Sequence, residues 1–190
     1  MNSITEANEV ARYGKLFGEM MLPQDGEECE FNPDWIRGHR WTVVPAESTA
    51  RIPPQNIPRI VSALQDSGYS NCIAVFNEPG HLRSLPVFVP SDPPSNMPTC
   101  YLVSVSDVDF HELNRQLGLF RFILAPEDRS WAVSCNEWYN LFSGGRNLVE
   151  AMLGEPVDRA RQEFFEFASA LAEENREEPL LRVAEHYASM

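Results

Sequence analysis

Apolar side chains recur along this chain at two spacings, and the change from one to the other divides the sequence into elements. Residues 5–21 repeat apolar positions every three or four residues, which predicts a helix with one buried face. Ser3 is expected to cap it, with Glu6 as its capping-box partner. Residues 22–40 are rich in turn-forming side chains and are predicted to form a loop.

The middle of the chain reads as short strands alternating with helices. The predicted elements are a strand at residues 41–44 ended by Pro45, a helix at 57–66 capped by Asn56, strands at 71–76 and 100–105, and a helix at 107–117 capped by Ser106. Residues 77–98 contain six of the fifteen prolines and so cannot be helical. They are predicted to form an ordered excursion, in which residues 85–89 could pair at a sheet edge.

Three apolar runs separated by two short polar turns follow, in the sequence FRFILAPEDRSWAVSCNEWYNLFSGG. Turns this short force antiparallel pairing, so residues 119–143 are predicted to form a β-meander. Helices are expected over residues 146–189, with a break at Gly154. The sequence therefore predicts a single α+β domain over residues 1–190, with an antiparallel or mixed sheet covered by helices.

The charge of the chain narrows the choice of partner. The net charge is −13, and acidic residues are concentrated in residues 1–34 and 155–190. Nucleic acids and anionic membranes are disfavoured because phosphate groups would be repelled. A basic protein partner fits better, although solvated helix faces also explain the acids. Because no segment has the apolar length of a signal peptide or a membrane span, a cytoplasmic location is expected.

Recognisable catalytic and metal-binding motifs are missing from the sequence. Its four cysteines are far apart and form no CxxC pair, which favours buried free thiols. His111 and Glu112 could begin an HExxH zinc motif, but Arg115 stands where the second histidine is needed. We therefore expect no cofactor, no metal site and no catalytic residues, and the chain is more easily interpreted as a binding protein than as an enzyme.

Two segments are candidates for contact with a protein partner. Residues 34–41 interleave aromatic and basic side chains, a composition typical of binding hot spots, although two tryptophans could equally hold this segment to the core. The second candidate is the acidic link near residue 173. The predicted partner-binding residues are Trp35, Arg37, His39, Trp41, Glu173 and Glu174.

A glycine pair after the meander is a further candidate. Gly144, Gly145 and Arg146 follow a strand and open a helix, the context in which free backbone N–H groups can bind an anion. The segment lacks the lysine and the spacing of a phosphate-binding loop. A tight turn that needs a positive φ is the alternative interpretation.

The meander and the helix RNLVEAML after it, about residues 119–153, resemble a pattern in bacterial immunity proteins that neutralise polymorphic toxins. The resemblance implies a protein that binds a toxin, but it assigns no role to any individual residue. Two alternatives stay open. One is a small-ligand binder or enzyme with a pocket near residues 77–98, using His81, His111 or Arg146. The other is a structural or phage-derived assembly protein.

Overall fold

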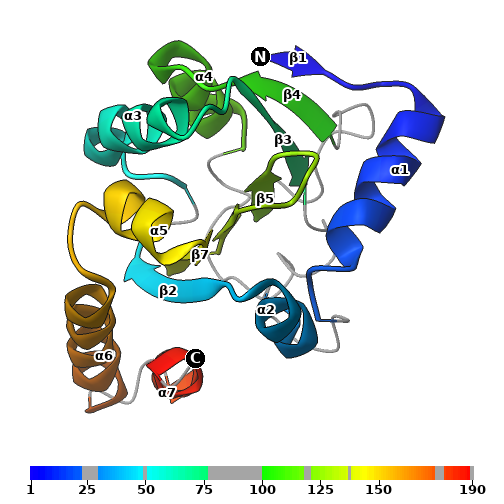
Figure 1. The fold of residues 1–190 in the computed structure, drawn as a ribbon. Helices are drawn as coiled ribbons and strands as arrows, with labels where there is room; N and C mark the ends of the chain where they lie inside the picture. Colours follow the sequence, from blue (N-terminus) through cyan, green and yellow to red (C-terminus); the bar gives the residue numbers. More distant parts are fainter. Residues whose placement is uncertain are drawn as a thin grey trace, which may run out of the picture.

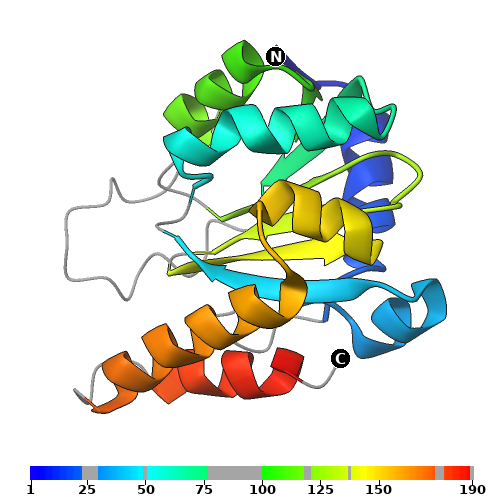
Figure 2. The same ribbon diagram turned by 60° about the vertical axis from the view of Figure 1, so that its left-hand side comes forward.

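A seven-stranded antiparallel sheet runs through the described part of the chain, with helices on both faces (Figures 1 and 2). The computed structural model describes residues 1–22, 30–48, 51–76, 100–117, 121–136, 138–173 and 178–188. The strands are β1 (Asn2–Ser3), β2 (Thr42–Glu47), β3 (Asn71–Phe76), β4 (Cys100–Ser104), β5 (Phe122–Ala125), β6 (Ala132–Cys135) and β7 (Tyr139–Gly144). The helices are α1 (Ala7–Gly18), α2 (Pro33–His39), α3 (Ile57–Asp66), α4 (Asp107–Leu117), α5 (Arg146–Leu153), α6 (Val157–Glu173) and α7 (Glu178–Ala188), with a 3₁₀ turn, η1 (Pro54–Asn56), before α3.

The strands lie in the order β1-β4-β3-β5-β6-β7-β2. Strands β5, β6 and β7 are neighbours in both sequence and space, which confirms the predicted meander. β2 comes from early in the chain and pairs with β7 at one edge, with Thr42 opposite Gly144. The α+β class predicted from the sequence is confirmed, and the sheet is antiparallel throughout.

Alternate side chains of each strand enter two separate cores. In β5, Phe122 and Leu124 face α3, α4 and α5, whereas Ile123 and Ala125 face the opposite side. We call these the α3–α5 core and the α1–α7 core; the second is covered by α1, α2, α6 and α7. Because both faces of the sheet are covered, the strands are apolar on both sides.

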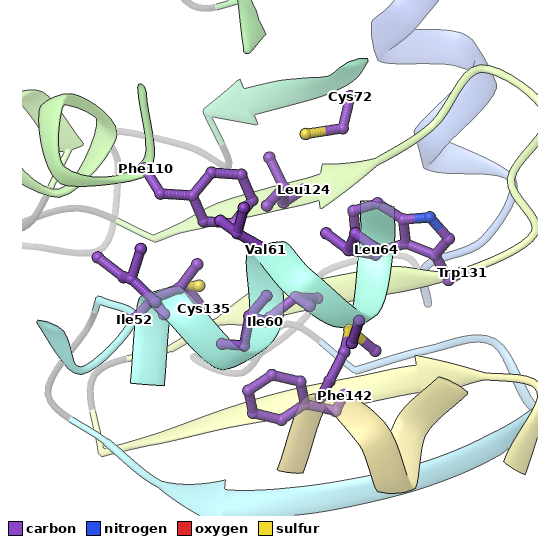
Figure 3. Close-up of a cluster of buried hydrophobic side chains, with 14 of the residues drawn as sticks. Ile52, Ile60, Val61, Leu64, Cys72, Phe110, Leu124, Trp131, Cys135 and Phe142 are labelled. Carbon is purple, nitrogen blue, oxygen red and sulfur yellow. The ribbon is translucent and has the colours of Figure 1, made fainter. Parts of the chain in front are cut away.

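The α3–α5 core holds the larger cluster. Figure 3 shows Val61 and Leu64 of α3 directed toward Leu124 and Trp131 of the sheet. Phe110 reaches the same cluster from α4 and is fully buried. The helix predicted at residues 57–66 therefore buries the stripe that its spacing indicated.

Helix α6 contributes to both cores because it crosses the outer edge of β2. Its first turns place Val157 and Ala160 in the α3–α5 core, and its later turns place Phe164 and Ala168 in the α1–α7 core. Figure 2 shows α6 running past the edge of the sheet toward α7. The side of α6 that faces away from the sheet is left exposed.

Strand β2 continues through Pro45, so the prediction that this proline ends the strand is wrong. The guanidinium of Arg161 on α6 donates to the carbonyl of Val43 at 2.9 and 3.3 Å, so the main chain of Val43 faces outward. Pro45, two residues on, faces the same way. Its missing N–H is thus on the unpaired edge, where a strand tolerates proline.

The start of the chain also differs from the prediction. Ser3 belongs to β1 and pairs with Tyr101 of β4, so it does not cap a helix. Helix α1 begins at Ala7, and Glu6 occupies its N-cap without a side-chain hydrogen bond. Backbone pairing with β4 therefore takes precedence over the predicted capping box.

Two other caps were predicted, at Asn56 and Ser106. Asn56 stands at the N-cap of α3, but its side chain makes no capping hydrogen bond. Ser106 does cap α4. The Oγ of Ser106 accepts a hydrogen bond from the N–H of Asp109 at 3.3 Å, at the start of α4. Asp109 in turn accepts the N–H of Ser104 at 2.8 Å and lies 2.6 Å from the amino group of Met1. The proline-rich residues 77–98 lie outside the described residues, so their predicted course stays a prediction.

Candidate functional site

Helix α2 holds three of the predicted partner-binding residues, in a stretch predicted to be a loop. The Oδ1 of Asn32 accepts the N–H of Asp34 at 2.9 Å, and Pro33 stands at the first helical position, where no N–H is needed. Ile36 is buried and fixes the helix to the α1–α7 core. The loop prediction for residues 22–40 is therefore wrong here, because a helix of 7 residues is too short to show its period.

Both faces of the Trp35 indole are occupied within the chain. The ring of His39 stacks on it with 3.7 Å between centroids and 15° between planes. The guanidinium carbon of Arg129 lies 4.5 Å from the indole centroid. Because a ring at stacking distance fills one face, the guanidinium must take the other. Trp35 therefore presents no free face on which a nucleobase could stack.

Trp41 belongs to the core. It is 6% exposed and meets Phe31 edge-on with 5.7 Å between centroids, and Trp35 edge-on at 6.0 Å. The hydroxyl of Tyr187 on α7 accepts the N–H of Phe31 at 3.3 Å. Trp41 thus holds the end of α2 against the α1–α7 core, and only Trp35 and its neighbours can be reached from outside.

The turn between β5 and β6 supplies Arg129 to this cluster. Arg129 has a φ of 54°, in the left-handed region that glycine usually fills in such turns. Its guanidinium lies 2.6 Å from the carboxylate of Glu19, just after α1, besides contacting Trp35. The side chain therefore ties α1 and α2 to the hairpin.

A second residue of the same turn binds α1. The hydroxyl of Tyr13 donates a hydrogen bond to the carboxylate of Glu127, which also pairs with Arg12 at 3.0 Å. Burial raises the pKa of Tyr13 to about 12, helped by the hydrogen bond to Glu127 and by its negative charge. The β5–β6 turn thus joins two helices that follow one another in the sequence.

Helix α2 ends in a Schellman motif. Arg40 has a φ of 53°; its N–H donates to the carbonyl of Arg37 at 3.3 Å, and the N–H of Trp41 donates to the carbonyl of Ile36 at 3.0 Å. Glycine is the usual residue at this position. Arg37 points outward and pairs with Asp34 at 2.5 Å. The end of α2 therefore exposes Arg37 and Arg40.

The glycine pair predicted as an anion site forms the turn from β7 into α5. Gly144 has a φ of 143°, and a Cβ there would lie 3.0 Å from the Cβ of Trp131 and 3.3 Å from the carbonyl oxygen of Ser130. Gly145 is the N-cap of α5, with an ordinary φ of −62° and open space around it. The interpretation as a turn needing positive φ is confirmed for Gly144.

Arg146 has two carboxylate partners. Its guanidinium lies 3.0 Å from Glu150 and 3.0 Å from Asp158, and their hydrogen bonds raise its pKa. An anion at this turn would have to compete with both carboxylates. Thr42 of β2 pairs with Gly144 of β7, and these two strands are antiparallel. Arg40, two residues before Thr42, and Arg146, two residues after Gly144, therefore lie at the same end of the sheet. Anion binding at Gly144, Gly145 and Arg146 stays a prediction.

The exposed side of α6 is acidic along its length. We call this surface the acidic face of α6; its carboxylates are Asp158, Glu163, Glu166 and Glu173. Arg159 is exposed on the same side and lies 2.8 Å from Glu163 and 3.3 Å from Glu155. Glu173, a predicted partner-binding residue, is at the end of this face, and Glu174 lies outside the described residues. Figures 1 and 2 place this end of α6 away from α2, so the predicted residues belong to two separate surfaces.

The residues of the enzyme alternative are dispersed. His81 lies outside the described residues, and His111 is exposed on α4. Glu112, next to it, accepts hydrogen bonds from Arg115 at 2.6 and 2.8 Å, and these, with one from Gln116, lower the pKa of its carboxyl to about 2. The helix thus uses this acid for an ordinary surface ion pair.

The cysteines of the described residues are free and buried, as predicted. They are Cys72, Cys100 and Cys135, whereas Cys29 lies outside that part of the chain. Burial raises the pKa of Cys72 and raises that of Cys100 to about 11. Thiols with such pKa values stay protonated at neutral pH and are weak nucleophiles.

Comparisons with known proteins give no relative on which to build. The chain matches no family model, no curated protein and no solved structure. Within the ranges that the structure describes, no group of three histidine, cysteine, aspartate or glutamate side chains could hold a metal ion. None of the helices described has the length and apolar character needed to span a bilayer. The surfaces of α2 and α6 are therefore the features from which function can be argued.

Proposed function

We propose that the protein is a non-catalytic binding module whose acidic face of α6 receives a basic protein partner. The observation that carries this is the run of four exposed carboxylates beside a single exposed arginine on one side of α6. The net charge of −13 strengthens the attraction of a basic surface from a distance. α6 is held by two cores, so this face is presented rigidly.

Charge arranged in this way acts mainly on the rate of encounter and on the choice of partner. Complementary surfaces raise association rates by roughly 10- to 1,000-fold at low salt, and this gain falls as salt increases. Glu166 and Glu173 are the carboxylates most available to a basic partner, because neither has a cation within ion-pair distance among the described residues. Glu173 can therefore pair with a partner without losing a contact among the described residues, and Glu166 would lose only the 2.8 Å hydrogen bond that its carboxylate accepts from the Nε2 of Gln162.

Within this class, we propose an immunity function: the protein would bind a basic toxin in the cytoplasm and neutralise it. The resemblance of residues 119–153 to immunity proteins and the acidic charge support this. An acidic face can occupy the surface with which a nuclease toxin meets phosphate. Buried free thiols suit a reducing compartment.

The test compares three forms of the protein as bait in lysate of its source organism. The triple variant Glu163→Gln, Glu166→Gln, Glu173→Gln removes three charges from the acidic face. We expect wild type to retain a basic protein, and the triple variant to bind that protein roughly tenfold more slowly at low salt, as measured by biolayer interferometry.

The matched control removes three exposed charges elsewhere, through Glu6→Gln, Glu9→Gln and Glu47→Gln. It should keep association within about twofold of wild type, since net charge alone has a weaker effect than a local face. Equal rates for both triple variants would contradict the assignment to α6. Failure of wild type to retain any specific protein would contradict the binding function itself.

A further inference from the structure

The acidic face of α6 is interrupted by a large apolar side chain, Phe165. Its ring is 39% exposed, whereas that of the preceding Phe164 is 2% exposed and lies in the α1–α7 core. Successive residues of a helix point about 100° apart, so Phe165 is turned away from that core. Among the described residues, Phe165 belongs to neither core. Packing inside the protein therefore does not account for a phenylalanine here.

Helix formation does not account for Phe165 either. Alanine, glutamate and lysine form helices more readily than phenylalanine, because an aromatic ring loses rotamer freedom on a helix. Exposed apolar residues that stand singly are common, so exposure alone would indicate nothing. The surroundings of Phe165 are more informative, since Ser169 and Ala172, one and two turns further along the same side, are small. They leave the ring uncovered on that side.

Phe165 lies beside carboxylates that are open to a cation. Glu166 is the next residue, and Glu173 lies two turns beyond Glu166. Neither has a cation within ion-pair distance among the described residues, and Glu166 accepts a hydrogen bond from the Nε2 of Gln162 at 2.8 Å. An apolar ring beside available charges matches the arrangement of protein interfaces, which have an apolar centre and a polar rim. A complementary partner surface is apolar at its centre and basic around it.

The shape of this face favours a helix as the partner. α6 has 17 residues, and its outer side is exposed along its length. Glu166 and Glu173 are seven positions apart, which corresponds to about 10 Å along the helix axis. A second helix lying along α6 has the same rise, so two of its basic residues seven positions apart can meet both carboxylates. An extended peptide would gain no main-chain hydrogen bonds here, because the backbone of a helix is already paired.

We propose that Phe165 is the apolar anchor of the acidic face of α6, and that this face binds a basic amphipathic helix of the partner. The apolar side chains of that helix enclose the ring, and its lysines or arginines pair with Glu166 and Glu173. The basic character of the partner follows from these local carboxylates and agrees in sign with the net charge of −13. The assignment depends on the proposed binding function, and it adds the anchoring residue and the kind of element that the partner supplies.

The test compares two peptides as probes at low salt: a leucine–lysine peptide that forms an amphipathic helix, and an oligolysine of the same charge. We expect wild type to bind the leucine–lysine peptide about tenfold more tightly, as fits the burial of one aromatic anchor. Phe165→Ala should reduce this preference to about twofold or less, mainly through faster dissociation, and should leave oligolysine binding within about twofold of wild type. Phe165→Leu keeps an apolar side chain and should retain most of the preference. Biolayer interferometry gives both rates, and circular dichroism checks that each variant is folded.

Val108→Ala is the matched control. It truncates an apolar side chain that is 77% exposed on α4, and it should leave the affinity for both peptides unchanged. Glu166→Gln combined with Glu173→Gln should instead slow the association of both peptides. A preference for the leucine–lysine peptide that persists in Phe165→Ala, or that wild type lacks while it still binds oligolysine, would overturn the role of Phe165 alone. Failure of wild type to bind either peptide would overturn the proposed function as well.

Discussion

Gly144→Ala should destabilise the protein far more than the same change at Gly145. At Gly144 the new side chain would have to adopt a φ of 143°, which costs about 2 kcal/mol. Its Cβ would also lie 3.0 Å from the Cβ of Trp131, and relieving that contact inside a fully buried cluster costs about 1 kcal/mol more. The lower entropy of the unfolded alanine chain returns about 0.7 kcal/mol. The free energy of unfolding should therefore fall by about 2 kcal/mol.

Gly145→Ala is the matched control, one residue away. Its φ of −62° suits alanine, and no atom lies within 4 Å of the added Cβ. Alanine is less favourable than glycine at an N-cap by roughly 1 kcal/mol, and the lower entropy of the unfolded alanine chain offsets about 0.7 kcal/mol of that cost. Its free energy of unfolding should stay within about 0.5 kcal/mol of wild type. Urea denaturation followed by circular dichroism at 222 nm measures both variants. A loss of less than about 0.5 kcal/mol for Gly144→Ala, or equal losses for the two, would refute this reasoning.

Three other changes test single contacts by the same measurement. Tyr13→Phe removes the hydroxyl that donates a hydrogen bond to Glu127. Because the pKa of Tyr13 is raised to about 12 in the folded protein, the protonated hydroxyl stabilises the fold fully below the unfolded pKa of 10.0. The stability advantage of wild type over Tyr13→Phe should therefore vanish as pH rises through 12, and an advantage that stays constant with pH would contradict this. Asp109→Asn should cost about 1–2 kcal/mol at pH 7. Burial alone would raise the pKa of Asp109, but hydrogen bonds from the terminal amino group and Ser104 lower it overall. The cost of Asp109→Asn should therefore persist above about pH 4 and shrink as pH falls further. A cost independent of pH would be contrary evidence. Arg129→Ala, combined in a double-mutant cycle with Trp35→Leu, should give a coupling of about 0.5–1 kcal/mol, and additivity would show that the cation–π contact contributes nothing.

The sequence predicted best those elements whose signals are local. The meander follows from two short polar turns, and α4 follows from Ser106, whose hydroxyl does cap it. The stripe in α3 is buried as its spacing indicated. In each case the residues that decide the element lie within it.

Predictions failed where distant residues decide the outcome. Ser3 has the sequence of a cap, but β4 offers it a backbone partner. Pro45 normally ends a strand, and it is tolerated because β2 turned out to be an edge, which no local pattern reveals. The start of helix α2 has a recognisable signal, Asn32 followed by Pro33. The many turn-forming residues around it favoured a loop instead.

The candidate surfaces show the same limit. The aromatic and basic composition of residues 34–41 was visible in the sequence, but the burial of Trp41 and the enclosure of Trp35 depend on β2 and on the β5–β6 turn. The positive φ values of Arg40 and Arg129 depend on how each turn is closed, and the sequence does not show them. Charge indicated α6 correctly as an acidic helix, but only the crossing over β2 shows which side faces outward.

The way the sheet ends limits how this protein can associate with others. At one edge α6 covers β2, where Arg161 takes the carbonyl of Val43. At the other edge β1 has only 2 residues, and Asp109 takes the N–H of Ser104 beside it. Among the described residues, an incoming strand would find one main-chain group at each edge already engaged, so pairing of a partner's strand there, in a fibril or by strand donation, is disfavoured. Helix side chains, and not strand pairing, must then determine which partner binds. A single substitution on a helix can change that specificity while leaving the sheet intact.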